Sequence, residues 1–383
     1  MKFVRLLLIP LALLIVGSVR LLARCGVLIR FGEFWSERIG HLAGNTECYL
    51  CEKDAGLHPK SFDIWTHRNK VSNKQLAKMI GREILVDPTR FTRLLILVNR
   101  MFRGWEKHVC NSEQLDRDIH NLFEKQGPHL EFTEAEERLG RKTLAEWGIP
   151  ENAKWVCLIV RDSAYLPDLT YHGYRDSDID TYPLVAEELV KRGYYVFRMG
   201  AKVAKRAESR WIIDYATNGM RSEFMDVYLG AKCEFAISNG TGIDAIPVIF
   251  RRPVCYVNYV PIEYLSTFNK RSLAIWKHHY KDGKRMSLKE IYESGAGQFM
   301  SSEKFTEAGI TLVDNTPEEI RDVVGEMEVR CGGYPFYDDW EYIRQREFWK
   351  LFPRSMSAYN AKPLHGEIRM RIGAKFLEQY DQR

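Results

Sequence analysis

The residues with the clearest capacity for chemistry lie directly after an apolar run at residues 233–237. They are Ser238, Asn239, Gly240, Thr241, Gly242 and Asp244. Glycines let a backbone approach a ligand closely, and the first turn of a helix presents N–H groups and a positive dipole end to an anion. A strand leading into this segment, with a helix beginning at Asp244, predicts a diphosphate site. An ordinary glycine-rich turn is the structural alternative.

A second polar group follows the apolar run at residues 155–160. Arginine binds phosphate through its planar fork, and a carboxylate can orient sugar hydroxyls. We therefore predict that Arg161 and Asp176 are catalytic residues, and that Arg198 and Gly200, at the end of the next strand, contact a nucleotide. The polar loop at residues 171–180 adds three candidate substrate-binding residues, which are His172, Tyr174 and Arg175.

The N-terminal half contributes a histidine after its first predicted strand. His41 titrates near neutral pH in its unperturbed state, so it is a candidate general base toward an acceptor hydroxyl, although a single histidine is more often structural. Its neighbours Gly40 and Asn45 are candidate substrate contacts. Lys277, farther along the chain, is a candidate phosphate contact.

Alternating strand and helix patterns surround these residues and predict parallel sheets covered by helices. Expected strands lie at residues 26–31, 61–65, 83–86, 155–160, 194–199, 211–214, 233–237 and 253–258. Expected helices lie at residues 41–53, 73–80, 91–101, 133–147, 181–192, 223–231, 287–293, 317–328, 340–350 and 367–380. Ligands of such sheets bind at the carboxyl ends of the strands, where the predicted polar segments lie.

Composition narrows the class of protein. The chain has 383 residues, 45% of them hydrophobic and 28% charged, which is typical of a globular enzyme and excludes wholesale disorder. The formal net charge of +5 is spread along the chain, without the basic block that nucleic-acid binding favours. The eight cysteines are scattered, as in a reducing compartment, and the close pair Cys48 and Cys51 lacks a second ligand pair in sequence. We therefore predict no metal and no resident cofactor.

The N-terminus is strongly apolar over residues 6–19, with Lys2 and Arg5 before it and Arg20 and Arg24 after it. The run is shorter than the roughly 20 residues that a spanning helix needs, and both flanks are basic. A shallow or re-entrant anchor that leaves the body of the protein on the cytoplasmic face of the inner membrane fits this pattern best. A buried first helix is the alternative.

Several segments together resemble a glycosyltransferase family found in bacterial surface-polysaccharide and O-antigen loci. They are residues 36–50, 174–180, 198–200, 213–215 and 238–261. The resemblance covers roughly residues 30–314 and implies a GT-B fold, in which two Rossmann-like domains face each other across a cleft, and sugar transfer from a nucleotide-activated donor.

The expected organisation is a membrane anchor at residues 1–24, a Rossmann-like acceptor domain at 25–110 and a helical linker at 111–150. A nucleotide-sugar-binding Rossmann-like domain follows at 151–335, and C-terminal helices at 336–383 pack back toward the N-terminal domain. The expected function is metal-independent glycosyl transfer to a lipid-linked or surface-glycan acceptor at the membrane surface. A sugar-nucleotide epimerase of the same fold and a non-catalytic scaffold of a polysaccharide assembly complex are the alternatives.

Overall fold

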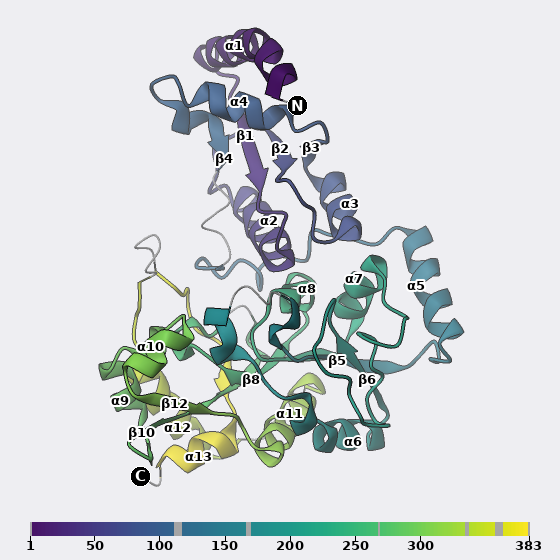
Figure 1. The fold of residues 1–383 in the computed structure, drawn as a ribbon, viewed down its shortest axis with the longest axis vertical. Helices are drawn as coiled ribbons and strands as arrows, with labels where there is room; N and C mark the ends of the chain where they lie inside the picture. The colour runs from purple at the N-terminus through teal and green to yellow at the C-terminus, as the bar shows by residue number, and fades with distance from the viewer. Residues whose placement is uncertain are drawn as a thin grey trace. The chain divides into compact units, whose positions relative to one another are not determined.

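The computed structural model describes residues 2–110, 117–165, 170–266, 269–333, 337–356 and 363–381. The chain divides into two compact units (Figure 1). Unit 1 comprises Met1–Arg117 and Pro128–Phe132, and unit 2 comprises Asp118–Gly127 and Thr133–Arg383. Each unit contains a parallel sheet with helices on both faces, so the predicted α/β class is confirmed.

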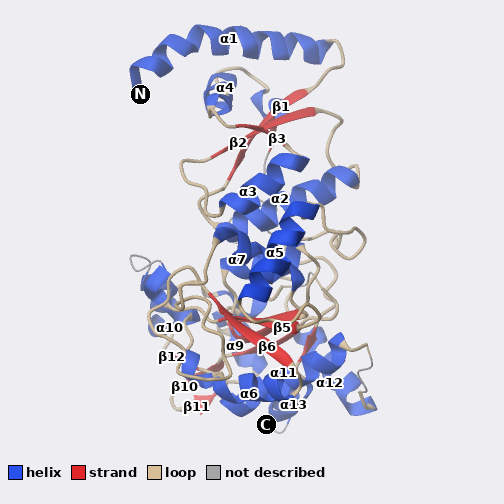
Figure 2. Ribbon diagram, turned by 90° about the vertical axis from the view of Figure 1, so that its right-hand side faces the viewer, coloured by secondary structure: helices blue, strands red, loops and turns tan. Residues whose placement is uncertain are grey.

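Unit 1 is built on a four-stranded parallel sheet in the order β3-β2-β1-β4. Its strands are β1 (Ile29–Phe34), β2 (Phe62–His67), β3 (Leu85–Asp87) and β4 (Val109–Cys110). Helices α2 (Ile39–Asp54) and α3 (Lys74–Glu83) lie on one face, while α1 (Lys2–Arg24) and α4 (Phe91–Asn99) lie on the other (Figures 1 and 2). Asn73 caps α3 through a hydrogen bond from the Leu76 N–H, as expected of a residue at this position.

The apolar helix α1 is longer than the predicted run, and it has two different sides. Ala12, Val16 and Val19 follow the i, i+4, i+7 spacing of one helix face and are buried against residues of α4 and β1. Leucines on other parts of the helix, including Leu7, Leu14 and Leu21, are exposed. By length and composition α1 is the one helix among the described residues that could cross a membrane. It is therefore partly a core helix of unit 1 and partly an exposed apolar surface.

Unit 2 is built on a six-stranded parallel sheet in the order β13-β9-β8-β7-β5-β6. Its strands are β5 (Lys154–Ile159), β6 (Tyr194–Met199), β7 (Phe235–Ser238), β8 (Val254–Tyr259), β9 (Leu273–Trp276) and β13 (Arg371–Ile372). A small antiparallel sheet joins β10 (His278–Lys281) to β11 (Lys284–Arg285) and β12 (Ile310–Val313). The strand predicted at residues 211–214 is wrong, because only a single bridge joins Ile213 to Phe197 there.

The helices of unit 2 cover both faces of the larger sheet (Figures 1 and 2). They are α5 (Glu134–Glu146), α6 (Pro183–Lys191), α7 (Glu223–Lys232), α8 (Ala245–Ile249), α9 (Leu288–Glu293), α10 (Ser302–Glu307), α11 (Pro317–Cys331), α12 (Asp339–Leu351) and α13 (Ala374–Asp381). Thr133 and Thr316 each form a capping box at the start of a predicted helix, and Pro317 opens α11. The last helix begins at Ala374, later than the sequence predicted.

The C-terminal helices pack on β9 of unit 2 through one tryptophan. The Trp276 ring stacks on Phe348 of α12 with centroids 5.4 Å apart and meets Phe376 of α13 edge-on at 4.7 Å. Its indole N–H donates a hydrogen bond of 2.9 Å to the Tyr380 hydroxyl. Packing of these helices toward the N-terminal domain stays a prediction.

Unit 1 contains a buried ion pair between neighbouring strands. Arg30 of β1 donates to both carboxylate oxygens of Asp63 of β2, at 2.8 and 2.9 Å, and Tyr49 of α2 also donates to this carboxylate. Burial by itself would raise the pKa of Asp63, but the hydrogen bonds from Arg30, Tyr49 and Ser61 lower it to about 2. The folded state therefore favours the ionised carboxylate.

We expect Asp63→Leu or Arg30→Met alone to destabilise unit 1 by about 3–5 kcal/mol, because each leaves a buried charge without its partner. The double variant should be more stable than either single one. The pair's contribution should be complete above the ordinary aspartate pKa of 3.8 and decline as the pH falls toward 2. Urea unfolding of the four proteins at pH 7 and pH 3 measures this, and additive single effects would contradict it.

Candidate functional site

The order of strands in unit 2 creates a reversal point at β5. The chain places β6 on one side of β5 and β7 on the other, so the loops that follow β5 and β7 diverge from neighbouring strand ends. Open parallel sheets bind ligands at such points, outside the carboxyl ends of the strands. Arg161 lies just after β5, and Asn239 and Gly240 lie just after β7. The structure thus brings the two polar segments that the sequence singled out to one edge of one sheet.

Asn239 joins these two segments. Its side chain is fully buried; the amide oxygen accepts a hydrogen bond of 2.9 Å from the Arg161 N–H, and the amide nitrogen donates one of 2.8 Å to the Arg175 carbonyl. One side chain from the β7 loop therefore pairs with backbone groups at two positions in the β5 loop. This role is structural and fixes the backbone of Arg161 and Arg175, two of the three cations described next.

Three cationic side chains converge on this edge. Arg161 Nη1 lies 3.4 Å from Asp176 Oδ1, and Lys277 donates to the Asp176 carbonyl at 2.5 Å and pairs with Asp314 at 2.8 Å. Arg175 Nη1 lies 3.5 Å from the Gly240 carbonyl, while its buried Nε has no hydrogen-bond partner among the described residues. The described ion pairs of the three cations thus involve two carboxylates, Asp176 and Asp314.

Burial and neighbouring charges shift the pKa of both Arg161 and Asp176. Burial, followed by the nearby charge of Arg175, lowers the pKa of the Arg161 guanidinium. Burial also raises the pKa of Asp176, against the lowering effect of Arg161 and Lys277. Crowded, partly desolvated cations of this kind favour an anionic ligand.

The segment from Ser238 to Asp244 is a tight turn, with a different geometry from the one predicted. Gly240 has φ of +80°, and a Cβ there would lie 2.9 Å from the Tyr259 ring, so glycine is required for conformation and for space. Gly242 is not among the residues with positive φ. A 3₁₀ turn at Gly242–Asp244 precedes the five-residue α8, so the helix does not begin at Asp244.

Asp244 holds this turn through its carboxylate. Oδ2 accepts hydrogen bonds from the Ser238 hydroxyl at 2.8 Å and the Thr241 N–H at 2.9 Å. Burial raises the pKa of Asp244 to about 6, although these hydrogen bonds lower it. Ser238 in turn accepts from the Gly240 N–H at 3.1 Å. Ser238, Thr241 and Asp244 thus shape the turn, and ligand contact by their side chains stays a prediction.

Arg198 and Gly200, predicted to contact a nucleotide, organise the loop after β6. Arg198 is buried, donates to the Lys205 carbonyl at 2.5 Å and lies 3.4 Å from Asp214 and 3.8 Å from Asp162. A Cβ at Gly200 would lie 2.8 Å from a methyl of Val203, so that glycine permits close packing. Both residues lie at the predicted strand end. The structure shows their contacts with other residues of this chain, and their contact with a nucleotide stays a prediction.

The remaining candidates of unit 2 lie in the 3₁₀ segment Thr170–Arg175. Tyr174 is buried, its ring packs against Phe305 at 5.6 Å, and its N–H donates to the Ser302 hydroxyl at 3.1 Å. The His172 ring lies 3.9 Å from that of Tyr171. The structure therefore gives Tyr174 a packing role beside the cations.

The candidates of unit 1 belong to α2. His41 lies in its first turn with its ring stacked on Trp35, at a centroid distance of 4.1 Å and an interplanar angle of 4°. Gly40 precedes it, and Asn45 is buried one turn later. Trp35 directly follows β1, the strand at which the order of this sheet reverses, so His41 is at the corresponding edge of unit 1.

Sequence reasoning missed a set of buried amides at the same edge of unit 2. The Asn258 side chain, at a residue with φ of +51°, donates to the Ser177 hydroxyl at 2.9 Å. The Asn258 N–H donates to the side-chain oxygen of Asn315 at 2.6 Å, and the Asn315 N–H donates to the side-chain oxygen of Asn258 at 2.5 Å. Asn315 also donates to the Trp276 carbonyl at 2.8 Å. Asn258, a polar residue at the end of the predicted strand 253–258, was the sequence feature that could have indicated this set of buried amides.

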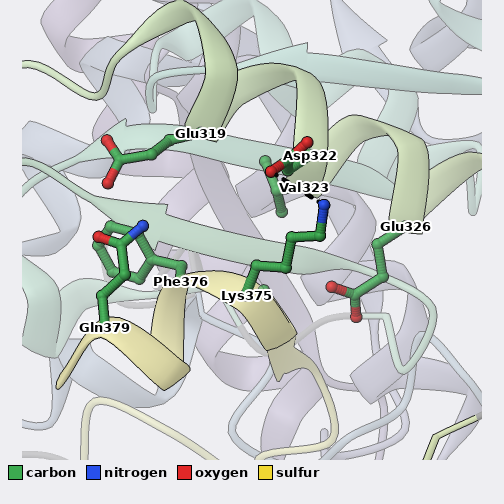
Figure 3. Close-up of a pocket in the computed structure, with 8 residues that line it drawn as sticks. Glu319, Asp322, Val323, Glu326, Lys375, Phe376 and Gln379 are labelled. Atoms are coloured by element: carbon green, nitrogen blue, oxygen red, sulfur yellow. Dashed lines mark ion pairs between the residues drawn. The ribbon is translucent and has the colours of Figure 1, made fainter. Parts of the chain in front are cut away.

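The pocket drawn in Figure 3 lies elsewhere in unit 2. It is lined by residues of α11 and α13 and by Gly373, with Lys375 paired to Asp322 at 3.2 Å, and its volume is about 20 Å³. That is close to the space of one water molecule, whereas ligand pockets typically enclose hundreds of cubic ångströms. None of the sequence-predicted site residues lines it, and we assign it no function.

No protein-family model matches the sequence, and no curated protein matches it. Among solved structures, the chain is similar to E. coli ADP-heptose LPS heptosyltransferase II, with 13% identity and a TM-score of 0.41 over 73% of this chain and 97% of that one. It is similar to the glycosyl transferase family 9 protein of Veillonella parvula DSM 2008, with 12% identity and a TM-score of 0.39 over 60% and 80%. It is also similar to TibC, an iron-containing dodecameric glycosyltransferase of enterotoxigenic E. coli, with 12% identity and a TM-score of 0.40 over 81% and 82%. Because these TM-scores are below 0.5, the proposals below rest on the residues of this chain.

We expect Asn239→Ala to loosen the site, because it leaves the Arg161 N–H and the Arg175 carbonyl without their buried partner, at about 1–3 kcal/mol for each group. Asn239→Asp keeps an acceptor for Arg161 but loses the donor to Arg175. Hydrogen exchange should therefore accelerate at the Arg161 amide in the alanine variant and less in the aspartate variant. Equal exchange in all three proteins would contradict this role for Asn239.

Proposed function

We propose that the chain is a glycosyltransferase of the GT-B type, which moves a sugar from a nucleotide-activated donor to a lipid-linked or surface-glycan acceptor. The observation that carries the proposal is the convergence of Arg161, Arg175 and Lys277 at the strand-order reversal of a parallel sheet. We assign donor binding to residues 151–335 and acceptor binding to residues 25–110, joined by a linker at 111–150.

The chemistry of this transfer places demands that these residues meet. The nucleoside diphosphate leaves with its negative charge, and fixed positive groups stabilise that charge as the bond to the sugar breaks. Arg161 and Arg175 offer planar forks for phosphate oxygens, and Lys277 offers a buried point charge. In this proposal the cations perform the role that a metal ion has in other enzymes, and Asp176 keeps Arg161 oriented.

The acceptor must lose a proton when its hydroxyl attacks the sugar. His41 is our proposed general base, because an imidazole accepts a proton near neutral pH and the Trp35 stack fixes the plane of its ring. Gly40 and Asn45 are the proposed acceptor contacts beside it.

Two alternatives make different predictions. A sugar-nucleotide epimerase would change the donor sugar without needing an acceptor, and a non-catalytic scaffold would bind nucleotide without turnover. The exposed apolar side of α1 favours the transferase, because a lipid-linked acceptor is found at a membrane whereas the substrate of an epimerase is soluble.

The decisive experiment incubates the purified protein with a panel of nucleotide sugars and a bacterial lipid extract, and measures the nucleoside diphosphate released. We expect release that depends on one donor and on the lipid.

Arg161→Ala and Arg175→Ala should each weaken nucleoside diphosphate binding by roughly 10–100-fold, since each removes a charge-assisted contact of about 1.5–3 kcal/mol. Arg138→Ala, which alters an exposed pair with Glu134 on α5, is the matched control.

Calorimetric titration separates the outcomes. Binding without release supports the scaffold, and an altered donor sugar without lipid supports the epimerase. Undiminished binding by both arginine variants would place the nucleotide elsewhere.

We further propose that α1 attaches the protein to the cytoplasmic face of the inner membrane by lying along its surface. Since Ala12, Val16 and Val19 are buried against unit 1, lipid cannot surround the whole helix while this packing is kept. Leu97 of α4 and Met101 just after it are also exposed apolar residues, and Arg24, Arg100 and Arg103 are exposed cations suited to anionic headgroups.

We expect the double variant Leu14→Gln/Leu21→Gln to lose binding to anionic vesicles, because both leucines are exposed on α1 (68% and 62%). Leu351→Gln, an exposed leucine of α12 in unit 2, is the matched control. Point changes are preferable to removal of α1, which would uncover Leu95 and Val98. Vesicle co-sedimentation measures binding, and a double variant that resists carbonate extraction from cell membranes would show a spanning helix instead.

A further inference from the structure

Helix α2 of unit 1 presents a line of side chains that the proposed sugar transfer does not use. Glu47, Cys51 and Asp54 follow the i, i+4, i+7 spacing of one helix face. Glu47 and Cys51 are buried, whereas the Asp54 side chain is 64% exposed. A sulfur and a carboxylate thus lie below the surface, and a second carboxylate lies at its edge.

A histidine from a distant part of the chain completes this group. His129 lies in the segment Pro128–Phe132, which belongs to unit 1 although the residues before and after it belong to unit 2. Its Nδ1 lies 3.0 Å from Glu47 Oε1 and 4.0 Å from Cys51 Sγ, and Cys51 Sγ lies 3.8 Å from Glu47 Oε1. One nitrogen, one sulfur and one oxygen therefore converge within 4.8 Å of one another.

These separations suit a single small cation. Zinc binds sulfur at about 2.3 Å and nitrogen or oxygen at about 2.0–2.2 Å, so ligand atoms at two corners of its tetrahedron are roughly 3.3–3.7 Å apart. The three observed separations of 3.0, 3.8 and 4.0 Å bracket that range. Small rotations of the side chains would bring all three atoms to bonding distance of a common centre.

The other nitrogen of His129 has the partner that a metal-bound histidine usually has. His129 Nε2 lies 3.1 Å from Asp54 Oδ2. A carboxylate at this nitrogen holds its proton, which turns the lone pair of Nδ1 toward the metal and orients the ring. Asp54 would be a positioning residue rather than a ligand.

We propose that Glu47, Cys51 and His129 bind one Zn²⁺ ion, with water as the fourth ligand and Asp54 orienting His129. The ion would fasten the segment Pro128–Phe132 to α2 of unit 1. Its role is structural and independent of the donor site, because all three ligands belong to unit 1 and the proposed donor contacts belong to unit 2. The sequence expectation of no metal considered only ligands close to Cys48 and Cys51, and His129 is 78 residues from Cys51.

Metal titration of the purified full-length protein, stripped of metal with a chelator and kept reduced, tests this proposal. Zn²⁺ should bind with one ion per chain in competition with a chromophoric chelator, and should raise the thermal unfolding midpoint. Co²⁺ in the same site should give a sulfur-to-cobalt charge-transfer band in the near ultraviolet. Cys51→Ser should abolish this band, and His129→Gln should weaken Zn²⁺ binding at least 10-fold.

Two further variants make the test specific. Cys48→Ser removes the buried cysteine one turn earlier on the same helix and should leave the stoichiometry and the cobalt band unchanged. Asp54→Asn should weaken Zn²⁺ binding by roughly 10–100-fold without removing the band, as expected of an outer carboxylate. Circular dichroism shows whether each variant is folded.

Absence of a stoichiometric ion and of the cobalt band in the folded wild-type protein would overturn the proposal and leave a hydrogen-bonded histidine–carboxylate cluster. Loss of the band in Cys48→Ser but not in Cys51→Ser would also overturn it. Because the readouts are metal binding and stability, they are independent of whether the sugar-transfer proposal holds.

Discussion

The candidate donor site depends on the buried side chain of Asn239, which joins two loops at the point where the strand order reverses. A parallel sheet brings the carboxyl ends of β5 and β7 together, but the loops that leave them diverge. The hydrogen bonds of Asn239 to the Arg161 N–H and the Arg175 carbonyl hold the loops at a fixed separation. The backbone positions of Arg161 and Arg175 follow from this, whereas Lys277 is held by the Asp176 carbonyl and by Asp314.

The buried cations of this protein differ in how many carboxylates lie beside them. Arg30 is matched by Asp63 with two hydrogen bonds and a third donor from Tyr49, so this network has no need of a further partner. Arg198 likewise lies between Asp162 and Asp214. Arg161 pairs with Asp176 and Lys277 with Asp314, whereas Arg175 has no ion pair among the described residues. The charges of Asp162 and Asp244 also act on Arg161 and Arg175, respectively. Arg175 could therefore pair with an anionic ligand without displacing a carboxylate from an ion pair, and the proposed function rests on this group of three cations.

Much of the fold could be predicted because it is encoded locally. Hydrophobic periodicity gave β5, β6 and α7 almost to the residue. Helices α3, α5 and α11 begin within one residue of their predicted starts, where Asn73, Thr133 and Thr316 cap them through side-chain oxygens. Strands β9 to β12 were missed because they are short and their partners are set by tertiary packing. At the site, the sequence treated Gly240 and Gly242 alike, but only Gly240 of the two has the positive φ that needs glycine. Contact of either glycine with a ligand stays a prediction. Asn239 was predicted to contact the ligand. In the structure its side-chain amide is hydrogen-bonded to backbone groups of Arg161 and Arg175, which no sequence pattern reveals.

The same limit explains why the zinc proposal required the structure. Glu47 and Cys51 share a helix face, which spacing alone can show, but neither residue type is diagnostic in a buried helix. The third donor comes from His129, in a segment of unit 1 that unit 2 flanks on both sides in sequence. A chain that leaves a folded unit and returns for only five residues gains little from hydrophobic burial, since so short a segment has few side chains to bury. Specific contacts must therefore hold it, and His129 provides them through Glu47 and Asp54, whether the centre of the cluster is a proton or a metal ion.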